Sequence, residues 1–110
     1  MGREIRFEMD GIRFSWDENK AKANWRKHKV AFEAAVWAFL DPNLVDLRDS
    51  MHDQDEQRRN IIAAIPSMMK LVFVIYVERI DDKEEEIIRI ISARKADRKE
   101  KEIYERGLSR

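Results

Sequence analysis

One uninterrupted apolar segment, LVFVIYV from Leu71 to Val77, limits the possible folds of this chain more than any other feature. It consists almost wholly of β-branched and aromatic residues, which favour strands over helices. A strand that is apolar on both sides needs cover on both faces, as a central strand of a sheet has. The segment is far too short to cross a bilayer, which takes about 20 residues. The chain is therefore predicted to build its core around a sheet.

Further apolar runs on both sides of this segment predict three more strands. Pro66-Ser67 and Asp81-Asp82-Lys83 are typical of turns, and connections of this length join antiparallel neighbours. We therefore expect an antiparallel four-stranded meander over residues 44–94. Its strands are predicted at Leu44–Asp49, Arg58–Ile65, Lys70–Arg79 and Glu86–Ser92.

In the N-terminal part of the chain the apolar residues recur with other spacings. Apolar residues alternate with polar ones on both sides of Asp10-Gly11, which predicts a ribbon over residues 1–16. Two helices are predicted over residues 17–40, and Asp17 can cap the first of them. Spacings of three and four residues put two stripes on this first helix. These stripes are Ala21, Trp25 and His28 on an apolar face, and Lys20, Asn24 and Lys27 on a polar one.

The second of these helices has a strong apolar stripe, and Asp41-Pro42 ends it. A third helix is predicted over residues 97–107, where Asp97 and Glu100 form a capping box and Gly107 can close the end. The prediction is one α+β domain over residues 1–110, with two N-terminal helices and one C-terminal helix packed on the sheet.

Charge and composition exclude several classes of protein. The formal net charge is zero, which argues against non-specific coating of nucleic acid, although cations are concentrated in residues 17–30 and 94–110. The chain contains no cysteine, which excludes disulfides and thiolate metal sites. His52 stands alone among carboxylates in a polar loop, so no metal site is expected there. The opening MGREIRFEMD lacks a long apolar segment, so we expect a cytoplasmic protein away from the membrane.

The octet RIISARKA, from Arg89 to Ala96, is the strongest candidate for a functional segment. It carries Ser92, Arg94 and Lys95 from an apolar strand directly into a charged helix. A strand end followed by a helix start holds side chains on rigid backbone, and positive charge there can receive a phosphate.

Several motifs in a fixed order resemble the BrnT family of type II toxins, over about Phe14 to Tyr104. They are F-x-W-D-x-x-K from Phe14 to Lys20, Asn24, Lys27-His28-x-Val30-x-Phe32, Asp41-Pro42, the segment from Glu56 to Arg59, Glu78-Arg79, and IRIISARKA from Ile88 to Ala96. The KH and SARKA blocks are specific in combination. The resemblance implies a RelE-like fold and an RNA-cleaving toxin that halts translation.

The same resemblance implies a partner. Toxins of this family are neutralised by a BrnA antitoxin with a ribbon-helix-helix DNA-binding fold, so DNA is contacted only through the antitoxin, and the complex can contain a dimer. The chain departs from the family at the join of its first two helices. Lys29 stands where glycine is usual, and Ala31 where a capping serine is common. We expect this join to differ.

RNA cleavage without metal or cofactor needs a base near the 2′-hydroxyl, a cation for the phosphate and an acid for the leaving 5′-oxygen. His28 titrates near neutral pH and can serve as base or acid, whereas arginines can clamp phosphate oxygens bidentately. The base and the acid stay unassigned among Lys27, His28 and Tyr104. The full candidate set is Lys27, His28, Arg59, Arg79, Ser92, Arg94, Lys95 and Tyr104.

Each candidate also has a structural interpretation. His28 shares the face of Trp25 and can be a packing residue. Arg89 and Glu78 can pair across neighbouring strands. Trp37, opposite the apolar stripe of its helix, is either a stray surface aromatic or an anchor for a partner. For the whole chain, the alternative to a nuclease is a non-catalytic module that binds protein or nucleic acid.

The nuclease hypothesis requires that the lysine–histidine pair and the arginines of the C-terminal half meet at one scissile linkage. Strand alternation sorts the residues of the last strand onto two faces, without deciding which face meets solvent. It puts Ile88, Ile90, Ser92 and Arg94 on one face, and Arg89, Ile91 and Ala93 on the other.

Overall fold

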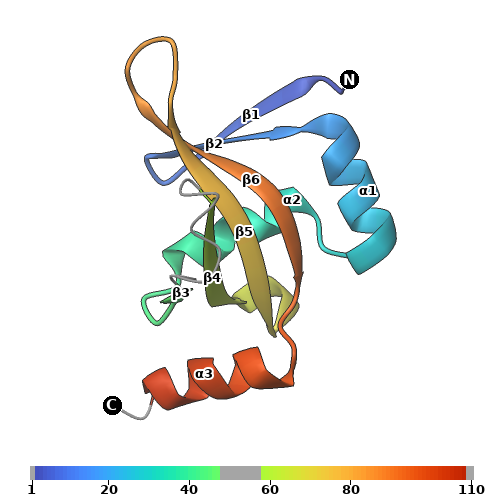
Figure 1. Ribbon diagram of the computed structural model, residues 1–110, viewed down its shortest axis with the longest axis vertical. Helices are drawn as coiled ribbons and strands as arrows, with labels where there is room; N and C mark the ends of the chain where they lie inside the picture. The colour runs from blue at the N-terminus through green and yellow to red at the C-terminus, as the bar shows by residue number, and fades with distance from the viewer. Residues whose placement is uncertain (1, 48–57, 109–110) are drawn as a thin grey trace.

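The computed structural model describes residues 2–47 and 58–108. Its six-stranded sheet has the order β1-β2-β6-β5-β4-β3 (Figure 1). The strands are β1 (Glu4–Met9), β2 (Ile12–Asp17), β3 (Val45–Leu47), β4 (Arg58–Ile65), β5 (Lys70–Ile80) and β6 (Glu86–Lys95). The helices are α1 (Glu18–His28), α2 (Phe32–Ala35) and α3 (Arg98–Leu108), with 3-10 turns η1 (Val36–Leu40) and η3 (Pro66–Met68). The expected α+β class is confirmed.

The expectation of a four-stranded antiparallel sheet is wrong, because the N-terminal hairpin joins the main sheet. β1 and β2 pair antiparallel around Asp10-Gly11, and β2 then pairs parallel with β6. The parallel register sets Phe14 opposite Ile88. Phe14 and Trp16 are each only 1% exposed, and they reach this burial because β2 extends the sheet over the core. The sheet is therefore mixed and six-stranded.

The remaining strands pair antiparallel in chain order. β4 has the predicted span, and β5 lies between β4 and β6 as its apolar run indicated. β6 continues three residues beyond its predicted end at Ser92 and takes Arg94 and Lys95 into the sheet. The predicted strand 44–49 is described only as far as Leu47, and His52 lies outside the described residues.

The two ends of α1 are stabilised differently. Its N-cap is Asp17, whose carboxylate accepts a hydrogen bond from the Lys20 backbone N–H at 3.0 Å. At the other end Lys29 adopts the left-handed conformation, with φ 58°, and its N–H donates to the Trp25 carbonyl. Lysine thus occupies a conformation that favours glycine. The ammonium of Lys29 lies 5.6 Å from the ring centroid of Trp25, and this cation–π contact partly offsets the strain.

The predicted apolar face of α1 is wrong for two residues. Trp25 is 50% exposed, whereas Asn24, placed on the polar stripe, is buried. Asn24 reaches the backbone of β6, where its side-chain amide satisfies groups that have no strand partner. A single asparagine among lysines carries no sequence signal of burial, so periodicity assigned it to the surface.

The second predicted helix is not one continuous α-helix. One α-helical turn, α2, is followed directly by the 3-10 segment η1. Ala31 occupies the N-cap position and its side chain forms no capping bond, which is the expected departure at the join of the helices. Tighter 3-10 geometry still buries Val36 and Ala38, and it leaves Trp37 48% exposed.

Apolar side chains cover the sheet on two faces, which we call the α2 face and the α3 face. On the α2 face, Val72, Val74 and Tyr76 of β5 belong to the main core with the residues of α2 and η1. On the α3 face, Phe73 packs with Tyr104 in a smaller cluster. Figure 1 shows α3 at one end of the sheet, where it covers only part of this second face.

Helix α3 begins with the predicted capping box. The Asp97 carboxylate accepts from the Glu100 N–H at 2.8 Å, and the Glu100 carboxylate accepts from the Asp97 N–H at 2.8 Å. Gly107 lies inside the helix, which continues to Leu108. None of the helices in the described residues is long and apolar enough to span a bilayer.

Candidate functional site

A β-bulge in β6 decides which side chains share a face. Ile75 of β5 lies opposite Ser92, and the next residue, Tyr76, lies opposite Ile90, so that Ile91 has no partner. One extra residue reverses the alternation of everything that follows it. The simple alternation predicted from the sequence is therefore wrong beyond Ile91.

The bulge gathers polar residues of β6 on the α3 face. Arg89, Ser92 and Arg94 lie opposite Val77, Ile75 and Phe73 of β5, which alternate onto this face. Ile88, Ile90 and Ala93 turn instead toward the main core on the α2 face, where Ile90 and Ala93 are buried.

Helix α1 is anchored to the edge of β6 through Asn24. The Asn24 Nδ2 donates to the Ala93 carbonyl at 2.8 Å, and the Ala93 N–H donates to the Asn24 Oδ1 at 3.1 Å. The same Nδ2 donates to the Val30 carbonyl at 2.9 Å, which also holds the turn after the helix. β2 does not extend along β6 as far as Ala93. The Asn24 side chain therefore supplies the hydrogen bonds that a neighbouring strand would otherwise give to the backbone of Ala93.

The anchor brings Lys27 and His28 to the level of the RIISARKA segment. α1 and β6 run in the same direction side by side (Figure 1). His28 lies one helical turn beyond Asn24, about 6 Å along the helix, and Lys95 lies about 7 Å beyond Ala93 along the strand. His28 is half-buried and Lys27 is exposed. The end of α1 and the end of β6 therefore form one edge of the molecule.

Arg94 is held by a carboxylate of α3. Its Nη1 and Nη2 donate to Glu100 Oε1 and Oε2 at 2.9 and 2.8 Å, and its guanidinium lies 4.4 Å from the ring centroid of Phe73. The hydrogen bonds to Glu100 raise the pKa of Arg94 against the opposing effect of burial. The side chain remains 34% exposed, and its Nη1 also donates to the Lys95 carbonyl at 3.2 Å.

Tyr104 is also engaged, at the opposite edge of the sheet. Its hydroxyl donates a hydrogen bond to Asp41 Oδ2 at 2.7 Å. This carboxylate oxygen also accepts a hydrogen bond from the Ala64 N–H at 2.8 Å. Burial and the bond to Asp41 raise the pKa of Tyr104 to about 12. Burial alone would raise the pKa of Asp41, but the bonds from Ala64, Tyr104 and Asn43 hold it below its usual value.

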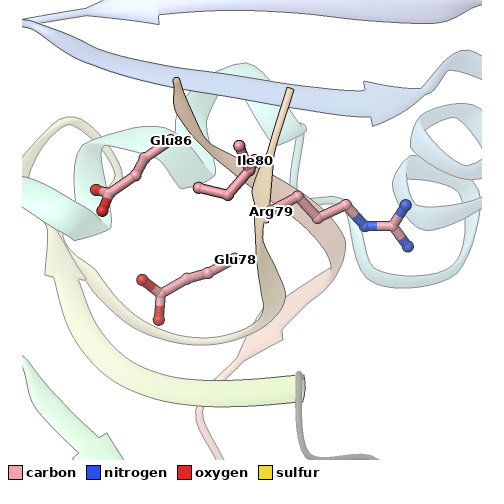
Figure 2. A pocket seen from close by; sticks show the side chains of 4 residues that line it. All are labelled: Glu78, Arg79, Ile80 and Glu86. Carbon is pink, nitrogen blue, oxygen red and sulfur yellow. The ribbon is translucent and has the colours of Figure 1, made fainter. Parts of the chain in front are cut away.

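Arg59 of β4 and Arg79 of β5 lie on opposite faces of the sheet. The Nε of Arg59 lies 2.6 Å from Glu78 Oε1 in an ion pair. Figure 2 shows Glu78 and Glu86 pointing to one side of the β5–β6 ribbon and Arg79 to the other. In the register, Arg79 lies opposite Ile87, so it shares the α3 face with Arg89. Arg79 is exposed.

The pair expected between Arg89 and Glu78 is absent, because Arg89 lies on the α3 face and Glu78 on the α2 face, and each has another partner. Arg89 binds Glu4 of β1 across the parallel junction, and Glu78 binds Arg59. Lys95, the last residue of β6, is exposed and lies opposite Val72. Within residues 2–47 and 58–108, no group of three or more histidine, cysteine, aspartate or glutamate side chains could hold a metal ion.

The carboxylates that bind Arg94 and Tyr104 are not predictable from the sequence. From the sequence, Glu100 is predicted only as part of the capping box, and Asp41 only as the end of a helix. Their spacing from Arg94 and Tyr104 along the chain carries no signal, because the contacts depend on how α3 packs on the sheet.

One comparison with known proteins identifies the family. No curated protein matches this chain. The family model described as a ribonuclease toxin, BrnT, of type II toxin-antitoxin systems matches residues 16–100. That span contains the last two residues of β2, the anchored helix α1 and the whole of β6. The chain belongs to the BrnT family of ribonuclease toxins of type II toxin–antitoxin systems.

Proposed function

We propose that this toxin is a metal-independent endoribonuclease whose site lies where the end of α1 meets the end of β6. The observation that carries the proposal is the two-way bond between Asn24 and Ala93. It fixes the Lys27-His28 pair at the level of Ser92–Lys95, and so joins two segments that are far apart in the chain.

The proposed reaction is attack of the RNA 2′-oxygen on the adjacent phosphorus. Lys27 and His28 are the candidates for proton transfer at this edge, and His28 is suited because imidazole titrates near neutral pH. Ser92 and Lys95, near the end of β6, supply a hydroxyl and positive charge for the phosphate. Arg79 lies opposite Ile87, about 25 Å from Lys95 along the ribbon, so its proposed role is contact with RNA away from the scissile linkage. The 5′-oxygen leaves with a proton, and the products carry a 2′,3′-cyclic phosphate and a 5′-hydroxyl.

The candidates that are bound to carboxylates have a positioning role in this proposal. Glu100 holds Arg94 at a fixed angle, and the exposed part of its side chain is available for a phosphate. Arg59 and Tyr104 are engaged by Glu78 and Asp41, which favours a role in stabilising the fold.

The proposed partner is a BrnA-like ribbon-helix-helix antitoxin in the cytoplasm. In this proposal the antitoxin binds both the toxin and DNA, and the toxin reaches DNA only through it. Exposed Trp37 on η1 is a candidate anchor for it, because a large aromatic at a surface can fill a pocket of a partner. A Trp37→Ala variant that binds the antitoxin with unchanged affinity would remove this residue from the interface.

The test is cleavage of RNA by purified protein in the presence of a chelator. Fragments should end in a 2′,3′-cyclic or 3′-phosphate. Replacement of Lys27, His28, Arg79 and Arg94 by alanine should abolish cleavage. A control with Lys83, Arg98 and Arg106 replaced removes the same formal charge at exposed positions and should keep activity. Intact RNA with the folded wild type, or undiminished cleavage by the first variant, would contradict the proposal.

Expression without an antitoxin separates this function from a non-catalytic binding module. A ribonuclease should stop growth and be rescued by the cognate antitoxin. Harmless expression together with intact RNA would favour the binding module.

A further inference from the structure

Three lysines from three different elements meet beyond the end of the β5–β6 ribbon. Lys95 ends β6 opposite Val72, and Lys70 begins β5 two residues earlier, so both lie on the same face. The Ala96 N–H donates to the Leu71 carbonyl at 2.9 Å, which continues the pairing past the strand end. Lys101 lies in the first turn of α3, which begins three residues after Lys95, and its positive charge contributes to the lowered pKa of Lys70. All three side chains belong to exposed residues.

These lysines differ from the arginines of the same chain. Arg3, Arg13, Arg59, Arg89 and Arg94 each bind a carboxylate. In the part of the chain that the structure describes, Lys70, Lys95 and Lys101 form no ion pair. The close approach of Lys95 and the positive charges of Lys95 and Lys101 instead lower the pKa of Lys70. Three lysines without an ion pair thus stand together in a chain whose formal net charge is zero.

We propose that Lys70, Lys95 and Lys101 form a binding subsite for the phosphates of an RNA strand that runs past the scissile linkage. The proposal rests on the ribonuclease function above. The cluster begins at Lys95, next to the edge formed by α1 and β6, so a strand leaving that edge passes directly over Lys70 and Lys101.

The chemistry of the cluster fits a phosphodiester backbone. Ammonium groups act as mobile point charges that contact phosphates without reading bases. A phosphate bound between the ammonium groups is attracted by each of them and offsets their mutual repulsion. Its binding also releases counterions from the RNA. Each such contact on a single strand contributes about 0.7 to the slope of log affinity against log salt. Loss of three contacts should therefore lower the slope by about 2.

Binding is best measured on RNA that cannot be cleaved. A labelled 2′-O-methyl oligoribonucleotide of about ten nucleotides lacks the attacking hydroxyl and is long enough for such a surface. Fluorescence anisotropy at several salt concentrations compares the wild type with a Lys70→Gln, Lys95→Gln, Lys101→Gln variant. The matched control is Lys83→Gln, Lys99→Gln, Arg106→Gln, which removes the same charge and includes two positions on α3. Circular dichroism confirms that both variants fold.

The cluster variant should bind at least about ten-fold more weakly at physiological salt, with a slope smaller by about 2, and the control should stay within about two-fold. Equal losses of RNA affinity in the two variants would show that only the total charge of the protein matters, and would overturn the proposed subsite. Unchanged RNA affinity with weakened antitoxin binding would overturn it in favour of an acidic protein segment. Because this RNA is not cleaved, a failure of binding is distinguished from a failure of catalysis in the cleavage assay.

Discussion

The side-chain amide of Asn24 in α1 and the backbone of Ala93 in β6 exchange two hydrogen bonds, one donated in each direction, as paired residues of neighbouring strands do. A comparable substitution occurs at the other edge of the antiparallel strands, where the Asp41 carboxylate accepts from the Ala64 N–H of β4. At both places a side chain takes over where a neighbouring strand ends. These two contacts attach the helical layer to the sheet at fixed levels.

Replacing Asn24 by alanine should both destabilise the protein and abolish RNA cleavage. The change leaves the Val30 and Ala93 carbonyls and the Ala93 N–H without their partner, which costs about 2–3 kcal/mol of unfolding free energy. Urea unfolding and cleavage of RNA measure the two effects. Asn19→Ala, at an exposed position of the same helix, is the control and should change neither. Full activity of Asn24→Ala would contradict the anchor.

Arg94→Lys should lower stability by about 1 kcal/mol, because lysine cannot reproduce the two parallel bonds to Glu100 or the stacking on Phe73. The control is Arg98→Lys in α3, the helix that carries Glu100. Arg98 pairs with Glu102 at 3.7 Å and its side chain is 96% exposed, so this change should have almost no effect. Equal urea midpoints for the two variants would show that the Glu100 pair contributes nothing.

Tyr104→Phe should reduce unfolding free energy by about 1–2 kcal/mol through loss of the bond to Asp41, and leave the cleavage rate of folded protein unchanged. The folded-state pKa of Tyr104, about 12, lies above the ordinary value of 10. Its contribution is therefore complete below pH 10 and is lost as pH rises toward 12. Unfolding measured between these pH values should show a smaller alkaline loss in Tyr104→Phe. A large drop in cleavage rate would instead assign Tyr104 a role in proton transfer.

Asp81 should make the β5–β6 hairpin sensitive to acid. Its carboxylate accepts from the Glu85 and Lys83 N–H groups and binds Arg13, and these contacts lower its pKa from 3.8 to about 2. The stabilisation is complete above pH 4 and is lost as pH falls through about 2. Asp81→Asn should remove this acid dependence and lower stability at neutral pH. Asp82→Asn, at an exposed position, should behave as the wild type at every pH.

Local features were readable from the sequence because they depend on neighbours along the chain. The span of β4, the cap at Asp17 and the box formed by Asp97 and Glu100 follow from residue type and spacing over a few positions. The central position of β5 follows from the apolar run Leu71–Val77, since only a strand covered on both faces can be apolar throughout.

Long-range features were not readable in the same way. The parallel pairing of Phe14 with Ile88 depends on the whole path of the chain between them. The bulge at Ile91 has no glycine or proline to mark it, yet it decides which face Ser92 and Arg94 share. The burial of Asn24 likewise depends on an edge of β6 that only the assembled sheet exposes. The sequence therefore names candidate side chains but does not reveal their arrangement.

The parallel junction between β2 and β6 also links this surface to the order of protein synthesis. β2 leaves the ribosome early, and its partner emerges only after β3, β4 and β5 have been made. Until then the edge that holds α1 does not exist, because Ala93 belongs to the strand still to come. A nascent chain that stops before β6 therefore lacks the strand to which Asn24 binds, so the contact between α1 and the sheet forms only when the last strand has been made.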